Sequence, residues 1–252
     1  MTASVLIWLA AAGVLAVLSW VAVARQARRF ERWASPAVLG CLLVAAAVAT
    51  PRHDGVQGWL IAALAFGVLG HAALCWQPQP VLDLALLPAG RAEPVVGRAE
   101  PVKVPRLRAN GLTDSRAERT FLLGSLSFLL GHLCYLCAMI RYGTDRLSVM
   151  FGLLLVLIAL FAFGYRIIAG ANVLGGALLS FGVSGYLVVL GSAVVLGVGT
   201  AQLWVAYGIV LFAVSDLLLA ADRFVQARPA APVTVIVSHQ LAQALLLIGL
   251  LR

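Results

Sequence analysis

The sequence contains, from Leu211 to Phe224, the stretch LFAVSDLLLAADRF, in which a carboxylate stands inside an apolar run. The run is long enough to cross a bilayer as a helix, and an ionisable side chain at membrane depth is costly unless it is paired or hydrated. Asp216 therefore needs a partner. Three of the four histidines, His71, His132 and His239, also stand in apolar runs. We expect these residues and Asp216 to mark a functional site within the membrane.

The composition of the whole chain is that of a membrane protein. Of its 252 residues, 62% are hydrophobic and 11% are charged, and the mean hydropathy is +1.01, unlike any ordinary soluble domain. A net charge of +8 is compatible with nucleic-acid binding, but the basic residues stand at the ends of apolar runs and in one long loop. That distribution is typical of membrane orientation. We therefore expect a multi-pass protein of the cell membrane that binds no nucleic acid.

The apolar runs predict an all-α, polytopic transmembrane helix bundle of about eight spans. The first run lacks a basic segment before it and a cleavage site after it, so we interpret it as a retained span and not a signal peptide. The second opens at Pro36, which suits the first turn of a helix. The sixth is rich in glycine and is expected to be an inner packing helix, because small residues let helix backbones approach closely. The predicted spans cover residues 3–24, 36–50, 57–76, 120–140, 147–165, 173–197, 201–221 and 232–251.

The distribution of Lys and Arg predicts how these spans are oriented. The connections after the odd-numbered spans carry fourteen of these residues, and the opposite side carries four. Because cytoplasmic connections are enriched in Lys and Arg, we expect the odd connections in the cytoplasm and both termini outside. The longest connection, residues 77–118, is rich in proline and contains the hexapeptide GRAEPV twice, at 90–95 and at 97–102. We interpret it as a flexible basic cytoplasmic loop that rests on anionic lipid headgroups.

Counting along the predicted spans brings the polar residues to similar depths. His71 and Asp216 each lie about five residues, or roughly 8 Å, from the cytoplasmic end of their span, and His239 lies roughly 10 Å from its own. His132 is deeper, and Gln243 follows His239 by four residues, on the same helix face. The simpler interpretation of each histidine alone is a hydrogen bond to a neighbouring helix. Together, the depths predict one polar pocket that opens to the cytoplasm.

Four cysteines stand in or at the ends of apolar segments: Cys41, Cys75, Cys134 and Cys137. The last two are three residues apart, so a helix would bring them to one face, where a redox or metal role is conceivable. The simpler interpretation is that all four are small packing residues. We predict no metal and no cofactor.

Three segments carry a resemblance to a known family. They are Gly124-x-x-x-Phe128-Leu-Leu-Gly131-His132-Leu-Cys-Tyr135, Val214-Ser215-Asp216-Leu-Leu-Leu-Ala220-x-x-Arg223-Phe224 and Leu241-Ala242-Gln243-Ala-Leu-Leu-Leu-Ile248. In this order they resemble the motifs of the YhhN family of lysoplasmalogenase-like membrane proteins, and the resemblance extends from about Trp33 to the end of the chain. It implies hydrolysis of the vinyl ether bond of lysoplasmalogens, with release of a fatty aldehyde and a glycerophosphobase.

That reaction explains the need for an acid inside the membrane. Protonation of the terminal alkene carbon gives an oxocarbenium ion, which water captures as a hemiacetal. A positioned acid delivers the proton, and a carboxylate or an imidazole activates the water. The resemblance implies that Asp216, His132 and His71 are the catalytic candidates. The side chains expected to bind the substrate, a membrane lipid or lysophospholipid, are Tyr135, Ser215, His239 and Gln243.

The chain departs from the family's usual pattern at two site positions. The third span usually has Gly-Asp where this chain has Gly70-His71, and His239 stands where the family usually has a tyrosine. If the missing carboxylate is the acid or the base, His71 must replace it, or the chain does not carry out the family's reaction. The alternatives are an altered family member that binds lipid or serves membrane homeostasis, and a transporter or proton relay. Haem ligation by His71 and His132 would need the two rings to face each other. The oligomeric state stays open.

Overall fold

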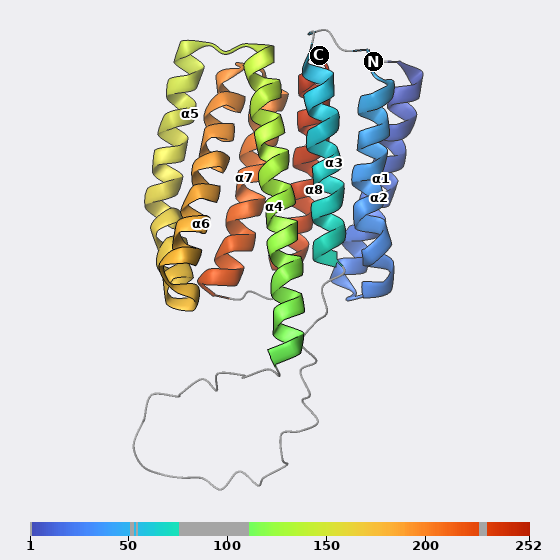
Figure 1. Cartoon of the computed structure of the whole chain (residues 1–252). Coiled ribbons are helices and arrows are strands. Elements are labelled where there is room, and N and C mark those ends of the chain that lie inside the picture. Colours follow the sequence, from blue (N-terminus) through green and yellow to red (C-terminus); the bar gives the residue numbers. More distant parts are fainter. Residues whose placement is uncertain (1, 51–52, 54, 76–110, 227–230) are drawn as a thin grey trace, which may run out of the picture.

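The computed structural model describes residues 2–50, 53, 55–75, 111–226 and 231–252, and these form a bundle of long helices (Figure 1). No strand occurs among the described residues, so the all-α prediction is confirmed for them. The helices are α1 (Ala3–Ala24), α2 (Arg28–Val48), α3 (Val56–Cys75), α4 (Gly111–Tyr142), α5 (Arg146–Ala159), the π-helical turn η2 (Leu160–Gly164), α6 (Tyr165–Gly199), α7 (Leu203–Phe224) and α8 (Ala231–Leu250).

Seven helical segments of the described chain are long and apolar enough to cross a membrane. One of them, Arg146–Gly199, has 54 residues. A straight helix of that length would measure roughly 80 Å, far more than the hydrocarbon thickness of a bilayer. The segment instead reverses at Gly176, whose φ of 67° and ψ of −162° leave the helical region, and Gly191 of the returning helix lies against Val156 of α5. The bundle therefore has eight passes, which confirms the predicted number of spans.

The helix boundaries differ from the prediction where charged residues extend a helix beyond its apolar part. The helix α2 begins at Arg28, so Pro36 lies inside it and not in its first turn. The helix α4 begins at Gly111, so residues 111–118 are helical, although they were predicted to belong to the loop. Hydropathy locates the apolar part of a helix, whereas backbone hydrogen bonding continues through the polar residues at its ends. The remainder of the predicted loop, with both GRAEPV copies, lies outside the described residues.

The two chain ends lie at the same end of the bundle, as an even number of passes requires (Figure 1). The first turns of α4 extend beyond the opposite end of the neighbouring helices (Figure 1). Which of the two ends faces the cytoplasm stays a prediction from the Lys and Arg distribution.

The helices α3, α4, α7 and α8 carry the polar residues that the sequence singled out, His71, His132, Asp216 and His239. The helix α3 packs along α4, and α7 packs along α8. Gly208 permits the second contact, because a side chain there would meet the α8 backbone at Leu246 and Ala242. The helix α6 is peripheral just after its reversal at Gly176, where Gly182 and Gly185 face open space. The prediction of an inner glycine-rich helix was therefore wrong for these two glycines. The helix α6 packs against α4 and α7, and its buried residues after the reversal begin at Leu187.

Candidate functional site

Two side chains from two other helices meet at the carboxylate of Asp216 on α7. His132 of α4 places its Nε2 3.5 Å from Asp216 Oδ2, and the Tyr186 hydroxyl of α6 donates a hydrogen bond of 2.5 Å to the same oxygen. The side chains of His132 and Asp216 are only 1% and 7% exposed. We call Asp216, His132 and Tyr186 the acid cluster. The histidine that partners Asp216 is thus His132.

The contacts of the His132 ring show which of its two nitrogens carries hydrogen and which faces Asp216. Its Nδ1 lies 2.7 Å from the carbonyl oxygen of Phe128. A carbonyl only accepts, so Nδ1 carries hydrogen and donates. Nε2 then faces Asp216, and it has no hydrogen-bond partner among the described residues. A bare Nε2 lone pair facing a bare carboxylate would be repulsive in a buried site, so the pair needs one proton, on Asp216 or on His132 Nε2.

Four other polar side chains form a second group, which we call the amide cluster: His71, Tyr135, His239 and Gln243. The Tyr135 hydroxyl donates to Gln243 Oε1. The amide nitrogen of Gln243 therefore faces His239 Nε2, at 3.2 Å, and donates to it. The ring of His71 lies beside that of His239, with their centroids 4.6 Å apart. The amide cluster is a chain of neutral groups in which tyrosine, glutamine and one histidine satisfy one another.

Two phenylalanine rings contact the amide cluster, and one of them also contacts the acid cluster. The ring of Phe212 lies 4.6 Å, centroid to centroid, from His132 and 4.6 Å from His239. Phe128 lies 5.3 Å from His239 and 5.6 Å from His71. The residues predicted to share one pocket therefore form two clusters, and the ring of Phe212 contacts a histidine of each. His71 belongs with His239, and its ring neighbours differ from those of His132, so the described contacts do not include the facing pair that haem ligation would need.

The predicted substrate-binding residue Ser215 has a contact of another kind. Its hydroxyl donates to the carbonyl oxygen of Val235 in α8 at 3.0 Å. This hydrogen bond ties α7 to α8 directly beside the acid cluster. Ser215 therefore holds the helix that carries Asp216 in place.

Sequence reasoning missed Tyr186 of the acid cluster and Phe212, whose ring contacts both clusters. Tyr186 stands in the glycine-rich run, which we interpreted only as a packing surface. The available signal was a phenol inside an apolar span, which needs a hydrogen-bond partner when it is buried.

A further set of polar residues ties α1, α2 and α8 together away from these clusters. The indole nitrogen of Trp20 donates to Gln240 Oε1 at 2.8 Å. The Gln240 amide lies 3.4 Å from the hydroxyl of Ser19, which in turn lies 3.0 Å from that of Ser35. None of these side chains titrates near neutral pH, so this network is suited to holding helices together.

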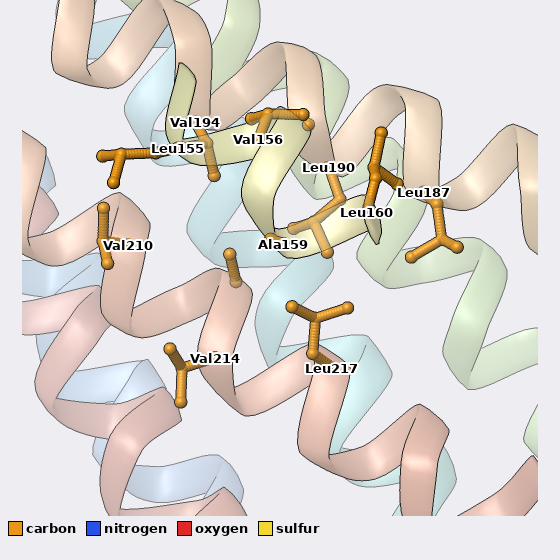
Figure 2. A pocket seen from close by; sticks show the side chains of 12 residues that line it. Leu155, Val156, Ala159, Leu160, Leu187, Leu190, Val194, Val210, Val214 and Leu217 are labelled. Atoms are coloured by element: carbon orange, nitrogen blue, oxygen red, sulfur yellow. The ribbon is translucent and has the colours of Figure 1, made fainter. Parts of the chain in front are cut away.

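An apolar groove of about 200 Å³ lies between α5, α6 and α7 (Figure 2). Two of its lining residues, Leu187 and Leu217, directly follow Tyr186 and Asp216 in the sequence. Its walls are formed by Leu155, Val156, Ala159, Leu160, Leu187, Leu190, Gly191, Val194, Val210, Ala213, Val214 and Leu217.

A comparison with protein-family models matches residues 111–250 to the model described as the YhhN family. The match covers more than half of the chain. The chain belongs to the YhhN family. This confirms the resemblance seen in the sequence motifs. Comparisons with curated proteins and with solved structures gave no match.

The part of the chain that matches the YhhN model contains the whole acid cluster. It also contains the groove and three members of the amide cluster, Tyr135, His239 and Gln243. His71 lies outside the matched residues, on α3. The acid cluster is thus built entirely from the YhhN segment, whereas the amide cluster draws one histidine from outside it.

Proposed function

We propose that the protein is an integral membrane hydrolase that cleaves the vinyl ether bond of lysoplasmalogen-type lysophospholipids by acid-base catalysis. Membership of the YhhN family supports a lysoplasmalogenase type of activity. The observation that carries the proposal is the buried contact of Asp216 Oδ2 with His132 Nε2 and the Tyr186 hydroxyl. This arrangement keeps one transferable proton in an apolar setting, as the reaction requires.

The mechanism assigns the first proton transfer to Asp216. The protonated carboxyl delivers its proton to the alkene carbon that is not bonded to the ether oxygen, which leaves a carboxylate on Asp216 and an oxocarbenium ion on the substrate. Tyr186 donates to the carboxylate and stabilises its charge. The neighbouring His132 is the base for the second step.

In the second step, water adds to the oxocarbenium carbon. His132 Nε2 takes the proton that the water loses and returns it to Asp216, so the acid cluster regains its starting proton. The hemiacetal then collapses: its hydroxyl loses a proton, the glycerol oxygen gains one, and the carbon–oxygen bond breaks. One water is consumed, and one aldehyde and one glycerophosphobase are formed.

An aldehyde-release assay with purified protein and lysoplasmalogen tests the proposal. Wild-type protein is expected to release aldehyde, and Asp216→Asn is expected to reduce release by a factor of at least about 100, the usual contribution of a general acid. Asp145→Asn is a matched control. Asp145 caps α5 through Ser148, and asparagine caps helices equally well. Wild-type protein without aldehyde release above background would contradict the proposal.

A second candidate function is lipid binding without hydrolysis, and His71 favours it. This residue stands where the family's third span usually has a carboxylate, and its ring lies against His239. The variant His71→Asp restores the usual residue. If aldehyde release appears in His71→Asp and not in the wild type, the natural protein is a lipid-binding member of the family.

A further inference from the structure

The apolar groove runs along α6 and α7, the two helices that carry Tyr186 and Asp216. On α6, Leu190 and Val194 follow Tyr186 by four and eight residues, so they lie on the same helix face. On α7, Ala213 precedes Asp216 by three residues and lies one turn away on its face. From Leu187 to Val194 the groove covers about two helical turns, or roughly 10 Å.

Figure 2 shows the two ends of the groove. Leu160, Leu187 and Leu217 lie at one end, and Leu155 and Val210 lie at the other. Leu187 and Leu217 directly follow Tyr186 and Asp216 in the sequence, so the first end is the one nearer the acid cluster. Leu160 is also the first residue of the π-helical turn η2. Single π-turns inside helices occur frequently at functional sites. The only π-turn among the described residues therefore lies at the end of the groove where the acid is.

The size and lining of the groove determine what fits in it. Its volume of about 200 Å³ is below the roughly 300 Å³ at which pockets for drug-sized ligands begin. All twelve lining residues are apolar, and three of them, Ala159, Gly191 and Ala213, are small. The groove therefore suits a narrow hydrocarbon ligand and excludes a polar one.

We propose that this groove binds the single hydrocarbon chain of the lysophospholipid, with the first carbons of the chain at Asp216. The proposal rests on the proposed function and names the part of the site that selects one-chain lipids over two-chain lipids. In a vinyl ether lipid the reactive carbons are the first two of the chain, at its junction with the polar head. A chain seated in the groove brings that junction to the acid cluster.

The position of the groove also orients the substrate. The chain extends from Asp216 toward Val210, that is, toward the beginning of α7. The head group therefore lies toward the end of α7 at Phe224, the end that the Lys and Arg distribution predicts to be cytoplasmic. A lipid of the cytoplasmic leaflet has this orientation, with its head outward and its chain toward the membrane centre.

Photolabelling with a saturated 1-O-alkyl lysophospholipid that carries a diazirine at the chain end tests this proposal. The saturated ether has no alkene carbon to protonate, so labelling is independent of turnover. With full-length protein in detergent micelles, label is expected at the end of the groove away from Asp216, at Leu155, Val194 and Val210. A lipid with two chains is expected not to compete for these sites.

Matched variants of one helix distinguish the groove from the lipid-exposed surface. Ala159→Phe fills the groove and is expected to lower groove labelling roughly tenfold or more, as a blocked apolar pocket does. Leu157→Phe lies on the same helix at a residue that is 55% exposed and does not line the groove, so its labelling is expected to equal that of wild type. Val210→Phe repeats the test from α7, in case Ala159→Phe fails to fold.

The outcomes separate this proposal from the proposed function. Label spread evenly over exposed helix faces, or label unchanged by both groove-filling variants, overturns the groove assignment even if aldehyde is released. Label in the groove that both variants remove supports the assignment, and it does so even if wild-type protein releases no aldehyde. In that second case only the hydrolase proposal is contradicted.

Discussion

The acid cluster and the amide cluster both contact the ring of Phe212, yet they differ in how their hydrogen bonds are satisfied. In the amide cluster the Tyr135 hydroxyl donates to Gln243, and the Gln243 amide donates to His239. In the acid cluster a carboxylate faces a ring nitrogen that has no hydrogen-bond partner among the described residues. A satisfied network stabilises a fold, whereas a pair that needs one more proton is able to exchange it. This difference is the reason why the proposed function places the chemistry in the acid cluster and a supporting role in the amide cluster.

The largest expected effect that tests this division comes from His132→Gln. Glutamine keeps a polar side chain of similar reach but cannot take a proton from water. Aldehyde release by the purified variant is expected to fall by a factor of at least about 100, with the helical circular dichroism spectrum retained. Release near the wild-type rate would mean that Asp216 works without this base, and the mechanism would be wrong.

A smaller effect is expected from Tyr186→Phe, which removes only the hydrogen bond to Asp216 Oδ2. Tyr186 is a positioning residue that stabilises the carboxylate left after proton transfer. We expect kcat to fall roughly tenfold, equivalent to one hydrogen bond to a charged group, with KM little changed. A rise in KM at constant kcat would instead assign the phenol to substrate binding.

In the amide cluster, Tyr135→Phe is expected to act on stability. It leaves Gln243 Oε1 without its donor, and the free energy of unfolding in detergent is expected to fall by about 1 kcal/mol. Aldehyde release at a temperature where the variant stays folded is expected to match wild type. A loss of activity as large as that of His132→Gln would show that the two clusters are one catalytic unit.

The smallest expected effect concerns Asp145, an exposed counterpart of Asp216. Hydrogen bonds from the backbone and side chain of Ser148 hold the pKa of the Asp145 carboxyl below its usual value. Its contribution to stability is therefore complete above the unfolded pKa of about 4 and is lost as the pH falls through the lower folded pKa. Unfolding curves of wild type and Asp145→Asn are expected to differ in their dependence on pH only in this acidic range. An equal difference at all pH values would contradict the assignment.

Much of the fold was predictable because hydropathy alone identifies a helix that crosses a bilayer. The apolar run around Asp216 gave α7 to within a few residues at each end. The reversal at Gly176 was not locatable, since glycines are frequent throughout that run and nothing in the sequence distinguishes the one with a positive φ.

The sequence predicted most residues of the candidate site, but it did not predict which of them contact one another. Asp216 and His132 were both identified because each is a polar group in an apolar run. Which of three histidines contacts Asp216 depends on how α4 and α7 pack, which is not encoded in spacing along either helix. Tyr186 was missed for the same reason, since its role appears only when α6 lies beside α7.

The helix α5 forms one wall of the groove, yet it packs chiefly against α6 and carries no member of the acid cluster. Substitutions along α5 can therefore alter the wall without disturbing the residues that transfer the proton. In evolutionary terms, if the groove binds the chain as proposed, the α5 residues of its wall can change which chain is accepted without changing the residues of the acid cluster on α4, α6 and α7. Selection can change the accepted chain while the acid cluster stays fixed, and an engineer has the same freedom.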